Sequence, residues 1–141
     1  MSEPQVYKGL AGVVVDTTSV SKVMPETNSL TYRGYAVQDL AARKSFEEVA
    51  WLLLHGELPS PAELQQFERE ERSQRELPSQ VSRLLELLPL QAHPMDTVRT
   101  AMSLLGATDL VVRPEATMLD QATFLLAKIP TVVAADFRRR H

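Results

Sequence analysis

Apolar residues recur at a helical period along most of this chain, from Val37 to its end. Two Ser-x-x-Glu capping boxes, at residues 45–48 and 60–63, mark the starts of two helices. Gly56 follows the first of these helices, at the position where a left-handed residue commonly ends a helix. A chain divided in this way is predicted to fold mainly as short helices that pack on one another.

Prolines and glycines divide the next part of the chain into two more predicted helices. Pro78 and Ser79 open one of them, and Pro89 stops it. Pro94 opens the other, and Gly106 is expected to end it.

The last predicted helix runs from about Glu115 to the C-terminus, after an expected flexible connection at 107–113. Pro130 lies inside it, and because proline removes one intrahelical hydrogen bond, a kink or break is expected there. One stripe of apolar residues alternates at three and four positions, which suits packing against another helix. The stripe consists of Leu119, Ala122, Leu126, Ile129 and Val133.

The first 35 residues differ from the rest of the chain. The apolar segment 10–15 and the alternating segment 30–35 are predicted to be two short strands joined by a polar loop. An isolated hairpin is marginally stable, so it is expected to pack on helices. The predicted organisation is an N-terminal arm with a short β-hairpin in residues 1–35 and a mainly α part in residues 36–141.

Composition excludes several classes of function. With 15 basic and 18 acidic residues the formal net charge is −3, which argues against a nucleic-acid-binding protein. There is no cysteine, hence no disulfide, thiolate zinc site or cysteine nucleophile, and this suits a cytoplasmic protein. No signal-peptide core is present, and the longest apolar stretch, 124–135, is judged too short to span a membrane.

The three histidines are the first candidates for acid–base chemistry. His55 ends a helix, where its charge can interact with the helix dipole. His93 precedes a helix start, where its ring can cap a free amide, and His141 is the last residue. Since no carboxylate or second histidine lies at a telling spacing, no catalytic residue is assigned. Metal-ligand spacings and phosphate-binding loops are also missing, so no metal or cofactor site is predicted.

Two arginine features have structural explanations. The run 138–140 stands where a helix C-terminus favours cations, and this is preferred over phosphate binding. Arg33 lies between Tyr32 and Gly34 in the predicted second strand. Because its charged side chain must reach solvent or a carboxylate partner, an ion pair is expected.

Several short segments, taken in order, resemble the opening third of a citrate synthase. They include Leu30-Thr31-Tyr32-Arg33-Gly34-Tyr35, Gly56-Glu57-Leu58-Pro59 and His93-Pro94-Met95-Asp96, with further matches at 9–18, 46–50 and 126–131. Within this family, the segments are most similar to those of bacterial 2-methylcitrate synthases and short citrate synthases. The resemblance implies a mainly helical fold, with this chain as the incomplete N-terminal part of the large domain.

The resemblance also implies an activity that the residues of this chain do not provide. Family members join oxaloacetate to an acyl-CoA thioester, using an aspartate base, histidines and arginines. These groups belong to segments of the His-Gly-Gly-Ala-Asn and Gly-x-Gly-His type, and neither occurs here. The family forms homodimers, in which the helix that begins at His-Pro-Met packs on its counterpart. The resulting interface candidates, for each of which intrachain core is an equal alternative, are Met95, Val98, Ala101, Met102 and Leu105.

Two functional hypotheses follow. In the first, the chain is the N-terminal segment of an acyltransferase of the tricarboxylic acid cycle or propionate catabolism. That enzyme would condense oxaloacetate with propionyl-CoA or acetyl-CoA, and the segment would be inactive alone. In the second, the chain is a stand-alone helical interaction or oligomerisation module without catalysis. Under either hypothesis, the apolar stripe of the last helix is expected to promote self-association.

Overall fold

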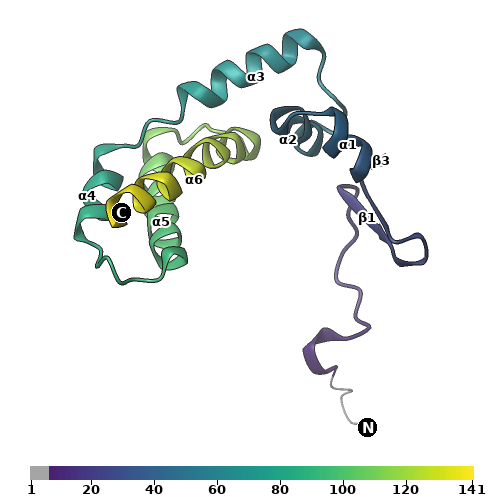
Figure 1. Cartoon of the computed structure of the whole chain (residues 1–141), viewed down its shortest axis with the longest axis horizontal. Helices are drawn as coiled ribbons and strands as arrows, with labels where there is room; N and C mark the ends of the chain where they lie inside the picture. Colours follow the sequence, from purple (N-terminus) through teal and green to yellow (C-terminus); the bar gives the residue numbers. More distant parts are fainter. Residues whose placement is uncertain (1–6) are drawn as a thin grey trace. The chain divides into compact units, whose positions relative to one another are not determined.

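The computed structural model describes residues 7–141, apart from the side chains of residues 109–112 (Figure 1). These residues form six α-helices and a small three-stranded antiparallel sheet, which confirms the predicted mainly α fold. The chain divides into two compact units, Met1–Leu58 and Pro59–His141. We describe each unit by itself.

The sheet of the first unit has the order β1-β2-β3. Its strands are β1 (Ser21–Met24), β2 (Ser29–Tyr32) and β3 (Tyr35–Ala36), with 3₁₀ turns at Lys8–Leu10 and Pro25–Thr27. Arg33 and Gly34 have φ angles of 48° and 90°, so a tight turn with two left-handed residues splits the predicted second strand into β2 and β3.

The strand predicted at 10–15 is wrong. Residues 13–18 have no assigned secondary structure, and β1 instead lies closer to β2 along the chain. A run of β-branched residues favours a strand only where a neighbouring strand can accept its hydrogen bonds, and β2 pairs with β1.

Two helices complete the first unit, α1 (Val37–Arg43) and α2 (Phe46–His55). Ser45 Oγ accepts a hydrogen bond from the Glu48 amide at 3.1 Å, and the Glu48 carboxylate accepts one from the Ser45 amide at 2.8 Å. Gly56 ends α2 with a φ angle of 97°. The predicted capping box and C-terminal glycine are therefore confirmed.

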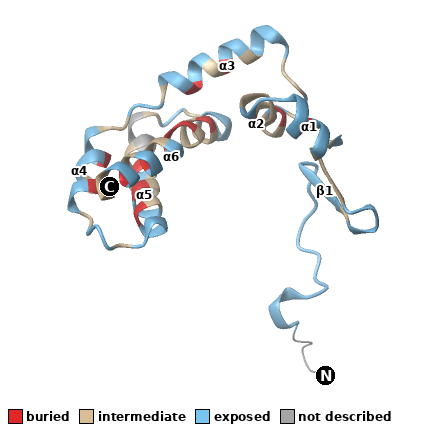
Figure 2. Ribbon diagram, in the orientation of Figure 1, coloured by how far each residue is buried: buried red, intermediate tan, exposed pale blue. Residues whose placement is uncertain are grey.

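The second unit is a four-helix assembly of α3 (Pro61–Ser73), α4 (Ser79–Leu87), α5 (Pro94–Val112) and α6 (Met118–Arg140). Helix α5 packs against α4 and α6, and α3 packs against α6. Figure 2 shows the buried residues gathered on the facing sides of α4, α5 and α6. The core of this unit consists of Val81, Leu85, Ala101, Leu105 and Val132.

Two helix boundaries differ from the sequence prediction. Helix α5 does not end at Gly106 but continues to Val112, so the loop expected at 107–113 is mostly helical. Gly106 keeps a helical backbone and does not adopt the positive φ angle with which a glycine often ends a helix. Of the kink or break expected at Pro130, the break does not occur: α6 is one continuous helix, with buried residues on both sides of the proline.

Helix α6 is an exception to the expectation that no segment could span a bilayer. By length and composition alone it is apolar enough to do so, as core helices of soluble proteins also are. Its buried residues include Lys128 and Asp136, and it packs against α3 and α5. We therefore interpret α6 as a helix of the second unit, with one side packed inside that unit.

Candidate functional site

The three histidines lie far apart in the chain, at the end of α2, just before α5 and just after α6, and each makes a local contact. The His55 ring stacks on Trp51 one turn earlier, with 3.6 Å between ring centroids. His93 Nδ1 accepts a hydrogen bond from the Met95 amide at 3.2 Å, which confirms the predicted cap. The His141 ring tilts against Phe137 at 4.5 Å. Within residues 7–141 no histidine pairs with a carboxylate, so these contacts are structural.

A buried ionic cluster of Asp136, Arg139 and Arg140 joins the end of α6 to the segment between α4 and α5. Asp136 is 3% exposed, and its two carboxylate oxygens accept hydrogen bonds from Arg139 and Arg140, each at 2.7 Å. Arg139 also donates to the Leu88 carbonyl, and Arg140 donates to the buried Thr97 hydroxyl. The arginine run thus lies at the helix end, as predicted. The sequence analysis missed Asp136. Its spacing of three and four residues from Arg139 and Arg140 was the signal that could have identified it.

The pKa of Asp136 reflects two opposing influences. Burial raises the pKa of this carboxyl because it disfavours the charged form, whereas hydrogen bonds from Arg140 and Arg139 lower it. The arginines prevail, so the pKa lies below its usual value and the carboxylate stays charged near neutral pH. A permanently charged carboxylate enclosed by two guanidinium groups suits a structural role better than proton transfer.

Lys128 is a second buried cation of α6, 5% exposed. Its ammonium group donates to the Glu76 carbonyl and lies 5.1 Å from the centre of the Phe124 ring. The Arg113 guanidinium lies 4.8 Å from the same ring centre. This cluster joins α6 to the segment before α4. The only sequence signal for this cluster is a lysine within an apolar stretch.

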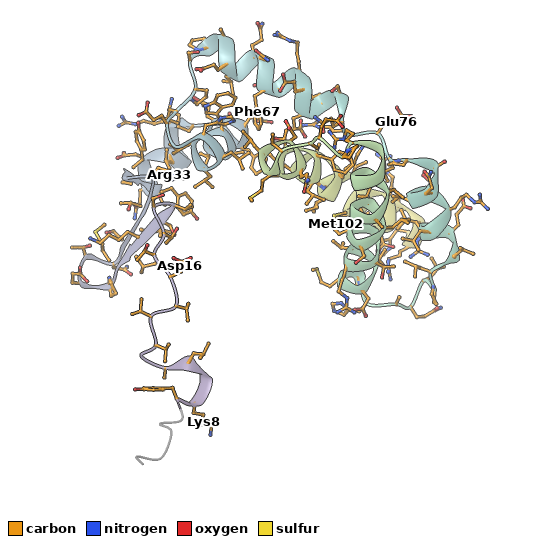
Figure 3. The ribbon with its side chains drawn as sticks, turned by 180° about the vertical axis from the view of Figure 1, so that it is seen from behind. Lys8, Asp16, Arg33, Phe67, Glu76 and Met102 are labelled. Atoms are coloured by element: carbon orange, nitrogen blue, oxygen red, sulfur yellow. The ribbon has the colours of Figure 1, made fainter. Side chains whose placement is uncertain are left out.

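Arg33 fastens the turn between β2 and β3 to the rest of the first unit (Figure 3). Its guanidinium donates to Ser19 Oγ at 2.6 Å and to the Leu53 carbonyl at 3.0 Å. The expected carboxylate partner is therefore wrong: a hydroxyl and a carbonyl take its place, because the turn directs the side chain toward these neutral acceptors.

The five interface candidates of α5 differ in exposure. Met95 is 62% exposed at the start of the helix, and Val98 and Met102 are partly buried. Ala101 and Leu105 are fully buried in the core of the second unit. Met95 is thus the candidate most available to a partner.

A hollow in the first unit has a lining poorly suited to a reaction centre. It measures about 420 Å³ and lies beside the sheet and α1. No side chain in its lining titrates; the lining consists of Val23, Met24, Pro25, Asn28, Ser29, Leu30, Val37, Gln38 and Ala41. The described part of the chain also has no group of three or more histidine, aspartate or glutamate residues that could hold a metal ion.

Comparison with known proteins identifies the family to which this chain is similar. Residues 9–141 match the family model described as "Citrate synthase, C-terminal domain". The 2-methylcitrate synthase of Mycobacterium tuberculosis is 57% identical over 137 residues, which are 97% of this chain and 35% of that protein. The chain thus spans about a third of the length of this relative.

Two solved structures share the fold. The crystal structure of citrate synthase from Pyrobaculum aerophilum matches with a TM-score of 0.84 and 30% identity, covering 96% of this chain and 36% of that one. Citrate synthase from Thermoplasma acidophilum, solved with carboxymethyl coenzyme A and oxaloacetate, has the same TM-score and coverage at 21% identity. The latter likeness concerns the fold alone.

Proposed function

The chain belongs to the citrate synthase family, and we propose that it is the N-terminal segment of an acyltransferase that condenses oxaloacetate with an acyl-CoA. The observation that carries this proposal is the 57% identity to a 2-methylcitrate synthase over 97% of the chain. Propionyl-CoA would give 2-methylcitrate and acetyl-CoA would give citrate. The relatives include enzymes named for each product.

We propose that the segment is inactive alone. The condensation needs a base next to the thioester, a donor for the ketone of oxaloacetate and cations for its carboxylates, all converging on one cleft. In the described part of the chain the histidines are separated, and the buried arginines hold Asp136 and backbone carbonyls. Further polypeptide would therefore supply the reacting groups.

The role left to this segment is to support a cleft that other residues line. A cleft must hold its groups to within a fraction of an ångström, so the elements behind it have to be rigid. The Asp136 cluster and the Lys128 contact provide this rigidity, since they join α6 to the segments before and after α4. This role also suits a cytoplasmic homodimer, with Met95 as its first interface candidate.

Complementation tests the proposal. The chain is mixed with oxaloacetate and either acyl-CoA, and the release of free coenzyme A thiol is followed. We expect no turnover from the chain alone. We expect turnover when it is mixed with the M. tuberculosis 2-methylcitrate synthase from which the matching 137 residues have been deleted.

The complementation has two controls, the deleted relative alone and the intact relative. Turnover by the chain alone would contradict its inactivity. A mixture that forms a complex but never turns over would contradict the segment proposal. In a working mixture, the ratio of kcat/KM for the two acyl-CoAs assigns the substrate, for which one methylene contributes about 1–3 kcal/mol.

A stand-alone interaction module is the second candidate function. The observation in its favour is the apolar outward face of α6, where Ile129, Val133 and Phe137 are 40%, 49% and 62% exposed. Contiguous exposed apolar surface of this kind is typical of an interaction site. Turnover in the complementation mixture would exclude a purely non-catalytic role.

A further inference from the structure

We draw no further inference here: the strongest candidate, the edge of β1 that faces away from β2 together with the apolar hollow beside the sheet and α1, carries no proposal, because nothing in the described part of the chain shows what covers it.

Discussion

Replacing Asp136 with asparagine tests whether the buried cluster holds the second unit together. The carboxylate is 5% exposed, and the guanidinium groups of Arg139 and Arg140 are 16% and 15% exposed. The substitution keeps the shape but removes the negative charge, leaving two buried cations without their anion. Breaking a buried pair by removing one partner costs about 3–5 kcal/mol. We expect about 3 kcal/mol here, since the asparagine oxygen still accepts one hydrogen bond.

The loss should depend on pH in a defined direction. Because the pKa of Asp136 is lowered in the folded state, its stabilisation is fully present above the unfolded value of about 3.9. It is lost as the pH falls from there through the folded pKa. The difference between wild type and Asp136→Asn should therefore be largest near neutral pH and shrink in acid.

Urea unfolding followed by circular dichroism at several pH values measures this difference as a free energy of unfolding. Asp96→Asn is the matched control, because Asp96 pairs with Arg99 at the same spacing of three residues but its side chain is 56% exposed. We expect the control to cost less than about 1 kcal/mol. Equal losses for the two variants, or a difference independent of pH, would refute the argument from burial.

Two further variants probe packing and capping. Leu105→Ala should cost about 2–5 kcal/mol in urea unfolding, because Leu105 is fully buried, whereas Leu87→Ala at an 82% exposed site should cost less than about 0.5 kcal/mol. Ser45→Ala removes the hydroxyl that accepts the Glu48 amide and should cost about 1 kcal/mol by the same measurement; no loss would mean that this capping box contributes nothing to stability.

The helix starts could be predicted from sequence because the hydrogen bonds that cap them join residues close together in the chain. Ser45 and Ser60 each cap an amide three residues later, and Gly56 takes its left-handed angle at the helix end. Each of these features depends on residues within one helical turn. The family resemblance added the fold class.

The errors concern features that distant residues decide. The strand expected at 10–15 lacks a partner strand, and the helix expected to end at Gly106 continues to Val112. The hydrogen-bond acceptor of the buried Lys128 is a carbonyl 52 residues away in sequence. For the interface candidates, sequence could not separate Met95 at the surface from Leu105 in the core, since both fit one helical period.

The last helix gives the strongest physical support for a scaffold completed by other polypeptide. Its buried side combines the apolar Ala127 and Val132 with three polar residues, Thr123, Lys128 and Asp136, which need hydrogen bonds and ion pairs to remain inside. Its outward side carries exposed apolar residues at the predicted spacing, including Ile129 and Val133. The outward side of a surface helix in a self-sufficient domain is mainly polar. Of the predicted stripe, Leu119, Ile129 and Val133 are exposed within the second unit, whereas Ala122 and Leu126 are partly buried. A partner that buries this stripe would restore the usual arrangement, as the proposed function requires.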